Sequence, residues 1–126
     1  MKTLGYYNGK FDEVENMMIP MNDRACYFGD GVYDATLARN YKIFAIDEHI
    51  DRFYNSAGLL RINIPYTKEE MKALLQEMVN KVETGNLFVY WQVTRGTGMR
   101  NHEFPEGDSN IWIMLKPGKV KDVYTP

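Results

Sequence analysis

Cysteine and histidine are scarce in this sequence, whose 126 residues include one cysteine and two histidines. Cys26 has no partner for a disulfide within the chain, which suits a reducing compartment, so we expect a cytoplasmic protein. Cys26, His49 and His102 are too widely separated to match the ligand spacing of a metal site. We therefore expect no bound metal.

An excess of positive charge and long apolar runs are also absent. The 15 Lys and Arg residues are balanced by 17 Asp and Glu residues, for a net charge of -2. Such a chain offers no basic field to nucleic acid, and we expect no nucleic-acid partner. No apolar run is long enough to span a bilayer, so we expect no membrane partner either. Hydrophobic residues nevertheless make up 44% of the chain, which predicts one folded domain with an ordinary core.

Alternation, turn residues and helix caps predict the elements of an α+β fold. Strands are predicted at residues 4–7, 11–19, 32–39, 42–46, 87–94 and 110–116. One helix is predicted over 47–60, with Asp47 as its N-cap. A second is predicted over 67–82, where Thr67 and Glu70 match a capping box. The order of elements predicts a mostly antiparallel sheet with both helices on one face.

The two most apolar strands, at 87–94 and 110–116, carry apolar residues on both of their faces. Strands of this kind need cover on both sides, and two helices can cover only one face of such a sheet. The sequence therefore predicts a partner on the second face, either another domain or another subunit. Composition changes after Lys116, so we expect a small domain at 1–116 and the start of an interdomain linker at 117–126.

Three short segments gather polar groups that suit an anionic ligand. They are 28–33 (FGDGVY), 49–53 (HIDRF) and 94–102 (TRGTGMRNH), and none of them contains a lysine. The third lies in a long connection between two strands, and such loops are often functional. Arg100 and His102 alternate, so in an extended segment both side chains can meet one ligand. The arginine fork matches a carboxylate. The donors for an anion are thus present without the amine that covalent chemistry would use.

Taken singly, each of these residues has a simpler explanation. Arg52 suits an exposed cation on a helix, Tyr33 an ordinary strand aromatic, and His49 a residue of the first helical turn. The two glycines in 29–31 permit a tight turn without indicating a ligand. This segment is not a P-loop, because the Lys and Ser/Thr positions of that motif are missing.

In their order, these segments resemble the N-terminal part of the class IV pyridoxal-phosphate aminotransferases (fold type IV). The resemblance is carried by 23–33 (DRACYFGDGVY), 47–52 (DEHIDR), 61–67 (RINIPYT) and 92–97 (QVTRGT). It covers essentially the whole chain. Within the family the sequence is most similar to the D-amino acid aminotransferases, because 100–105 (RNHEFP) keeps both the arginine and the histidine.

The resemblance implies a role for five residues. Arg52 would contact the phosphate of the cofactor, pyridoxal 5'-phosphate. Tyr33, Arg100 and His102 would bind the α-carboxylate of the substrate, with the last two reaching in from the neighbouring subunit of a homodimer. Ala35 would line the side-chain pocket. The substrates would be a D-amino acid and a 2-oxo acid.

The resemblance also implies that the chemistry needs a part that this sequence does not contain. The family's Schiff-base lysine belongs to a larger C-terminal cofactor domain, and none of the nine lysines here has the matching context. We therefore expect the isolated chain to contain no catalytic residue and to be inactive. The handedness of the substrate depends on where that lysine lies, so this sequence leaves it open.

Two alternatives stay open at this point. The chain could be the small domain of an aminodeoxychorismate lyase or of a branched-chain aminotransferase, which the pairing of Arg100 with His102 disfavours. It could also be a free-standing α+β binding module without catalysis. The second apolar sheet face disfavours that module, because it predicts association with a partner.

Overall fold

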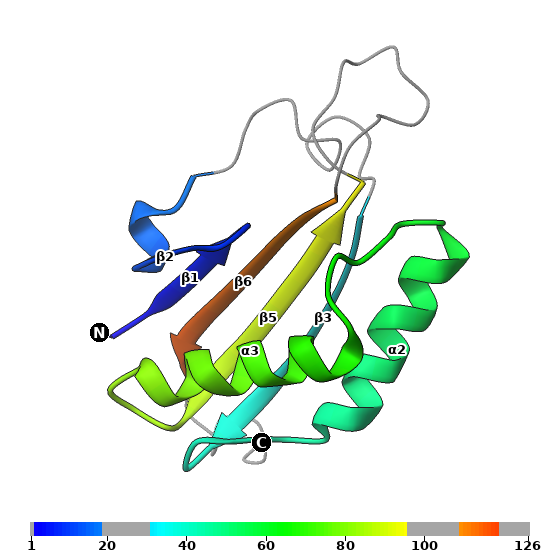
Figure 1. Ribbon diagram of the computed structural model, residues 1–126. Coiled ribbons are helices and arrows are strands. Elements are labelled where there is room, and N and C mark those ends of the chain that lie inside the picture. The colour runs from blue at the N-terminus through cyan, green and yellow to red at the C-terminus, as the bar shows by residue number, and fades with distance from the viewer. Residues whose placement is uncertain (1, 19–30, 96–108, 119–126) are drawn as a thin grey trace, which may run out of the picture.

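The computed structural model describes residues 2–18, 31–95 and 109–118. Within them, a six-stranded antiparallel sheet carries two α-helices on one face (Figure 1). The elements in chain order are β1 (Leu4–Tyr7), β2 (Lys10–Asp12), the 3₁₀ helix η1 (Val14–Asn16), β3 (Gly31–Arg39), β4 (Lys42–Ile43), α2 (Ile46–Leu59), α3 (Lys68–Lys81), β5 (Leu87–Thr94) and β6 (Asn110–Pro117). The strand order is β2-β1-β6-β5-β3-β4. The predicted α+β fold, with both helices on one side of an antiparallel sheet, is confirmed.

The first hairpin turns where the Asn-Gly dipeptide predicts it. Asn8 and Gly9 both have positive φ, 47° and 95°, as a tight hairpin turn of the primed type requires. The predicted strand at 11–19 is wrong over 13–18, because β2 ends at Asp12 and η1 follows, and residue 19 lies outside the described residues. The Asp12 side chain accepts a hydrogen bond of 2.7 Å from the next backbone N–H. Such local bonds compete with a strand ladder and favour a turn.

The start of α2 also differs from the prediction. β4 ends at Ile43, so the predicted strand at 42–46 is wrong in its second half. Ala45 adopts a left-handed conformation (φ 50°, ψ 42°) and is the N-cap, and the helix begins at Ile46. Asp47 therefore lies in the first turn and is not the cap. Its carboxylate remains close to the positive end of the helix dipole, where a negative charge is favourable.

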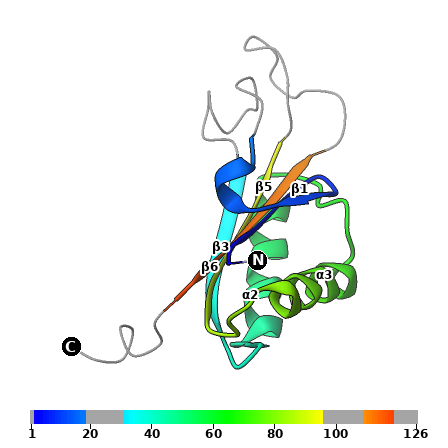
Figure 2. The same cartoon turned by 90° about the vertical axis from the view of Figure 1, so that its left-hand side faces the viewer.

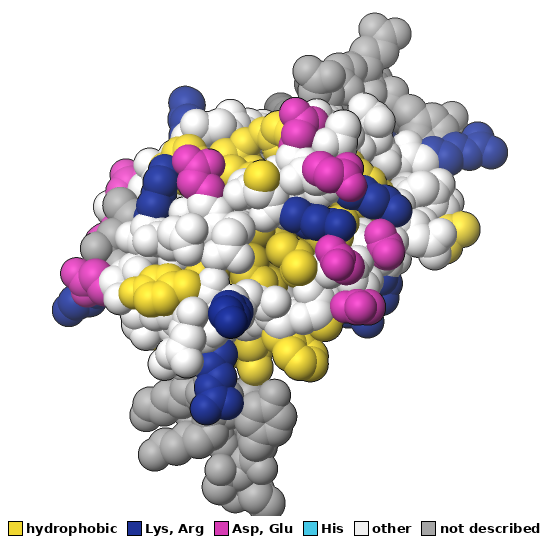
Figure 3. All heavy atoms as spheres, turned by 60° about the horizontal axis from the view of Figure 1, so that its bottom comes forward, with side chains coloured by type: hydrophobic (Ala, Val, Ile, Leu, Met, Phe, Trp, Pro, Cys, Tyr) yellow, Lys and Arg dark blue, Asp and Glu magenta, His cyan; other side chains and the backbone are white. Residues whose placement is uncertain are grey.

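The capping box of α3 is confirmed. The Thr67 hydroxyl accepts a hydrogen bond of 3.1 Å from the Glu70 backbone N–H, and the Glu70 carboxylate accepts one of 2.9 Å from the Thr67 backbone N–H. Both charge signs are interspersed over the side of the molecule that Figure 3 shows. The helices pair some of these charges, as in the contact of 2.8 Å between Lys72 and Asp47. Neither helix among the described residues has the length and apolar character that a membrane span requires.

The hydrophobic core lies between the helices and the sheet. Trp91 of β5 is fully buried and meets the ring of Phe53 from α2 edge to face, with centroids 6.1 Å apart. The opposite sheet face carries neither helix, as the side view in Figure 2 shows. On that face 67% of Tyr33 and 40% of Phe88 are exposed. Tyr33 therefore lies largely exposed on the face that neither α-helix covers.

Candidate functional site

The candidate site lies along one edge of β3. This strand pairs with β5 over its full length, but with β4 only at its C-terminal end. Among the described residues, no strand pairs with the outer edge of 31–36. The Leu37 carbonyl accepts a hydrogen bond of 2.8 Å from the Phe44 N–H on this outer side. Because alternate residues of an antiparallel strand turn their main-chain groups the same way, those of Tyr33 and Ala35 face this side too.

Side chains reach this edge from both faces of the sheet. Asp34 faces the helices and is only 5% exposed, whereas Tyr33 and Ala35 lie on the opposite face. The Tyr33 ring stacks on the ring of Tyr90, with centroids 5.5 Å apart and an interplanar angle of 22°. A ligand beside the strand could therefore contact groups from both faces.

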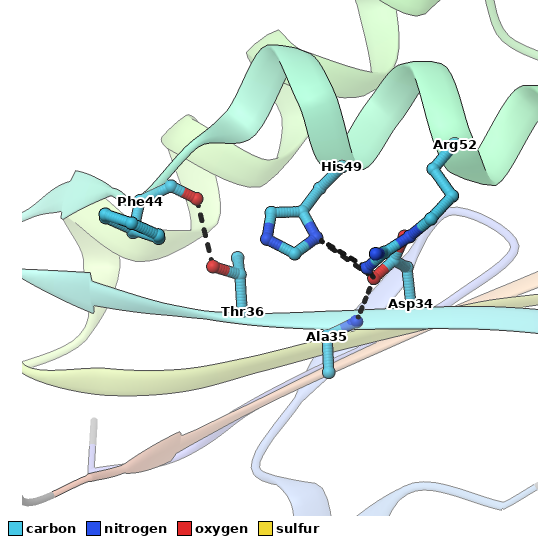
Figure 4. A network of polar contacts seen from close by, with 6 residues as sticks. All are labelled: Asp34, Ala35, Thr36, Phe44, His49 and Arg52. Atoms are coloured by element: carbon cyan, nitrogen blue, oxygen red, sulfur yellow. Dashed lines mark hydrogen bonds and ion pairs between the residues drawn. The ribbon is translucent and has the colours of Figure 1, made fainter. Parts of the chain in front are cut away.

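Two side chains of α2 converge on Asp34, as Figure 4 shows. Arg52 Nε donates a hydrogen bond of 3.0 Å to Asp34 Oδ2, and Arg52 Nη2 donates one of 2.6 Å to Oδ1. This is the paired geometry in which a guanidinium binds a carboxylate most firmly. His49 Nδ1 lies 3.1 Å from Asp34 Oδ1 and 3.1 Å from Arg52 Nη2. His49 and Arg52 lie one helical turn apart, so both can reach the same carboxylate.

The cluster formed by Asp34, His49 and Arg52 keeps the buried Asp34 carboxylate ionised. Burial alone would raise the pKa of the Asp34 carboxyl, but hydrogen bonds from Arg52, from the next backbone amide and from His49 lower this pKa by more. The hydrogen bond to Asp34 in turn raises the pKa of Arg52. A buried carboxylate is costly unless it is paired and hydrogen-bonded, and Asp34 is both. The pair is therefore a carboxylate and a guanidinium at neutral pH.

Arg52 differs from Asp34 in its exposure. The arginine side chain is 64% exposed, against 4% for the aspartate. A guanidinium has several N–H donors in a planar fork, and Asp34 takes only the side that carries Nε. No described residue accepts a hydrogen bond from Arg52 Nη1. Within the described part of the chain, Arg52 is therefore an anchored cation with unused donors beside a strand edge that no other strand pairs, and such a group is suited to an anion such as a phosphate.

A separate pocket of ≈ 310 Å³ lies on the sheet face opposite α2 and α3, between η1 and strands β1, β5 and β6. Its walls are mainly apolar and include Met17, Tyr90, Trp112 and Met114. Arg52 is not among its lining residues. Tyr90 belongs to the pocket and also stacks on Tyr33, so it connects this hollow to the edge of β3.

The structure brings together only part of the predicted site. The structure places three of the predicted residues at the same stretch of β3. Tyr33 and Ala35 belong to this strand and lie on one face of the sheet, and Arg52 of α2 contacts Asp34 on the opposite face. Arg100 and His102 lie outside the described residues.

Sequence reasoning missed Asp34 and assigned His49 no function. A signal was available: alternation along β3 places Asp34 on the same face as the buried Thr36 and Ala38. A carboxylate in that position needs a cationic partner. Arg52 and His49 are spaced to supply it from one side of a helix.

The family model for amino-transferase class IV matches residues 31–122, well over half of the chain. The matched range contains β3, α2 and the Asp34–Arg52 pair. The chain therefore belongs to the class IV aminotransferases, as the sequence resemblance predicts. Members of this family use pyridoxal 5'-phosphate.

Curated relatives of this chain include several D-alanine aminotransferases. The enzyme of Listeria monocytogenes serotype 4b (strain F2365) is 46% identical over 102 residues, which cover 79% of this chain and 35% of that protein. The enzyme of Staphylococcus haemolyticus is 35% identical over 111 residues, which cover 86% of this chain and 39% of that protein. The chain thus spans between a third and two fifths of the length of these relatives.

Solved structures of branched-chain amino acid aminotransferases share the fold. The Escherichia coli structure superposes with a TM-score of 0.83 at 17% identity, covering 94% of this chain and 42% of that chain. The structure from the archaeon Thermoproteus uzoniensis, solved with norvaline, gives a TM-score of 0.79 at 19% identity, covering 92% and 41%. At these identities the similarity concerns the fold, which matches part of each of these enzymes.

Proposed function

We propose that this chain is the small N-terminal domain of a pyridoxal-phosphate-dependent transaminase that moves an amino group between a D-amino acid and a 2-oxo acid. The domain would occupy 1–116, with a linker from 117 to a cofactor domain. The observation that carries the proposal is the exposed guanidinium of Arg52, anchored by Asp34 beside the edge of β3 that no described strand pairs. The identity to D-alanine aminotransferases supports the choice of substrate class.

In this proposal Arg52 binds the phosphate of the cofactor. The Arg52 guanidinium suits a phosphate, because it is exposed, anchored and able to donate further hydrogen bonds. Pyridoxal phosphate, when bound, supplies the electron-accepting ring that amino-group transfer requires. Among the described residues, no lysine contacts Asp34, His49 or Arg52. The reactive amine would therefore come from the cofactor domain.

The substrate carboxylate would be held by Tyr33, Arg100 and His102. The Tyr33 side chain is largely exposed on the sheet face opposite α2 and α3, where its hydroxyl is accessible to a ligand. Ala35, on the same face, would line the space for the substrate side chain. These residues bind and orient the substrate, and none of them has to move a proton.

The sheet face opposite α2 and α3 is the side on which we propose that the remainder of the enzyme packs. Tyr33 and Phe88 expose aromatic surface there, and the apolar pocket opens on the same side. A second subunit of a homodimer would bring its own Arg100 and His102 to this site. The low cysteine content suits the cytoplasm, where we propose that the enzyme acts.

The proposal can be tested with a hybrid enzyme in which this chain replaces the matching third of the Listeria monocytogenes D-alanine aminotransferase. The two sequences are 46% identical over 102 residues, so the exchange keeps nearly half of the residues in the matched segment. We expect the hybrid to transfer the amino group of D-alanine to a 2-oxo acid, and the isolated chain to show no turnover. A folded, cofactor-loaded hybrid that accepts branched-chain L-amino acids but not D-alanine would contradict the substrate class. Turnover by the isolated chain would contradict the domain assignment.

A further inference from the structure

We propose that Asp34 is a positioning residue that fixes the Arg52 guanidinium with its free edge toward a phosphate. The inference rests on the proposed function, because it concerns how the proposed phosphate contact is made. Asp34 would thus support phosphate binding, although a negative charge beside a phosphate site ordinarily weakens anion binding.

The geometry supports positioning over simple charge pairing. Asp34 accepts from both Nε and Nη2 of Arg52, at 3.0 and 2.6 Å, and two hydrogen bonds to one carboxylate fix the plane of the guanidinium as well as its position. Because the Nε side is occupied, the edge formed by Nη1 and the outer hydrogen of Nη2 points away from Asp34. This edge belongs to the side chain that is 64% exposed.

Asp34 is itself fixed from several directions. Its Oδ1 accepts a hydrogen bond of 2.8 Å from the Ala35 backbone N–H, and His49 Nδ1 lies 3.1 Å away. The carboxylate side chain is only 4% exposed, so solvent cannot readily reorient it. A rigid acid therefore holds a long and flexible base that would otherwise sample many rotamers.

Two effects of Asp34 on phosphate binding have opposite signs. As a negative charge, it repels a phosphate, and its removal should strengthen binding. As an anchor, Asp34 holds the Arg52 side chain in place before the phosphate binds, so little side-chain entropy is lost on binding. Removal of Asp34 should then weaken phosphate binding by about 3- to 10-fold. The direction of the change therefore distinguishes the positioning role from a purely electrostatic one.

The test uses the 126-residue chain, ¹⁵N-labelled and titrated with inorganic phosphate and, separately, with pyridoxine 5'-phosphate at constant ionic strength. The readout is the NMR signal of the Arg52 Nε–H group. Asp34→Asn keeps the shape of the side chain but removes the charge and the acceptor for Nε. Asp51→Asn is the matched control, because it removes the same charge next to Arg52 on α2, where Asp51 contacts Lys68 at 3.1 Å.

We expect phosphate to shift the Arg52 signal in the wild-type chain, and Asp34→Asn to need about 3- to 10-fold more phosphate for the same shift. Asp51→Asn should bind phosphate as tightly as the wild type, or more tightly. If Asp34→Asn binds phosphate equally well or better while the wild type binds, Asp34 does not position Arg52, and the proposed phosphate contact is unaffected. If phosphate leaves the wild-type Arg52 signal unchanged, the phosphate contact itself is wrong, and the positioning role fails with it.

A second measurement needs no variant and covers the case in which Asp34→Asn fails to fold. In the wild-type chain without phosphate, the Arg52 Nε–H group should exchange slowly with water and show restricted motion. Arg39 is the internal comparison, since it lies at the exposed end of β3 and its side chain forms no hydrogen bond or ion pair with another described residue. If the Arg52 guanidinium moves as freely as that of Arg39, the positioning role is wrong.

Discussion

Arg95 holds the C-terminal end of α2, where its Nη2 donates a hydrogen bond of 2.7 Å to the Leu60 carbonyl. Its Nη1 lies 3.4 Å from the next carbonyl, that of Arg61, which has a left-handed backbone conformation with φ 57°. The last carbonyls of a helix lack partners within the helix, so a cation at this end is favourable. The contact joins the end of β5 to the helix that carries Arg52.

Removing this contact should destabilise the domain moderately. We expect Arg95→Ala to lower the free energy of unfolding by about 1–2 kcal/mol, because a charged donor to helix-terminal carbonyls is lost. Arg95→Lys keeps the charge without the fork and should recover part of the loss. Urea unfolding followed by circular dichroism measures both effects. Equal stability of Arg95→Ala and the wild type would show that the contact contributes nothing to the fold.

Acid should remove the stabilisation that ionised Asp34 provides. Its folded-state pKa lies below its usual value of about 3.9. The contribution is therefore fully present above about pH 4 and is lost as the pH falls through the lower folded-state value. We expect Asp34→Asn to be about 1–3 kcal/mol less stable than the wild type at pH 7, and this difference to shrink below about pH 4.

Urea unfolding of both chains between pH 7 and pH 3 measures this difference. Asp51→Asn serves as the control, because Asp51 is exposed and lies outside the cluster. A difference between wild type and Asp34→Asn that stays constant, or grows on acidification, would contradict the assignment of an ionised and stabilised Asp34.

Local signals predicted much of the fold because they depend on nearby residues. The capping box at Thr67 and the alternation of 87–94 each fix an element with little help from the rest of the chain. Ala45 shows where such reasoning fails. It adopts a left-handed conformation next to Phe44, whose backbone N–H donates to the Leu37 carbonyl of β3. A contact with a separate strand of this kind cannot be predicted from the residue pattern near Ala45.

The candidate site was less predictable from the residues themselves than the fold was. Tyr33 and Arg52 came from the resemblance to a family, because neither would be selected from its chemistry alone. Asp34 was missed because its role depends on the packing of α2 against β3. The periodicity of a sequence predicts helices and strands, but it does not predict which of them are in contact. The same packing converts His49 from an ordinary helix residue into a neighbour of the buried carboxylate.

The role of Arg100 can be separated from a structural role by the choice of substrate. If Arg100 binds the substrate carboxylate, its removal takes away the fixed charge of that contact, since a guanidinium stays charged at all relevant pH values. In the hybrid enzyme, Arg100→Ala should lower kcat/KM for D-alanine by about one to two orders of magnitude. The loss should be small for a matched primary amine without a carboxylate. Equal losses on both substrates would mean that Arg100 acts through loop structure or subunit contacts.

The most direct test of the account is the dissociation constant of pyridoxal 5'-phosphate for the hybrid enzyme and its Arg52→Ala variant. The central claim is that this chain contributes its phosphate contact through Arg52, anchored by Asp34. Loss of a guanidinium–phosphate contact should raise the dissociation constant by about 10- to 100-fold, while KM for D-alanine rises less. Arg39→Ala, which removes an exposed arginine from the far end of β3, should leave it unchanged. Equal cofactor affinity in Arg52→Ala and the wild-type hybrid would contradict the claim and leave Arg52 as the partner of Asp34 alone.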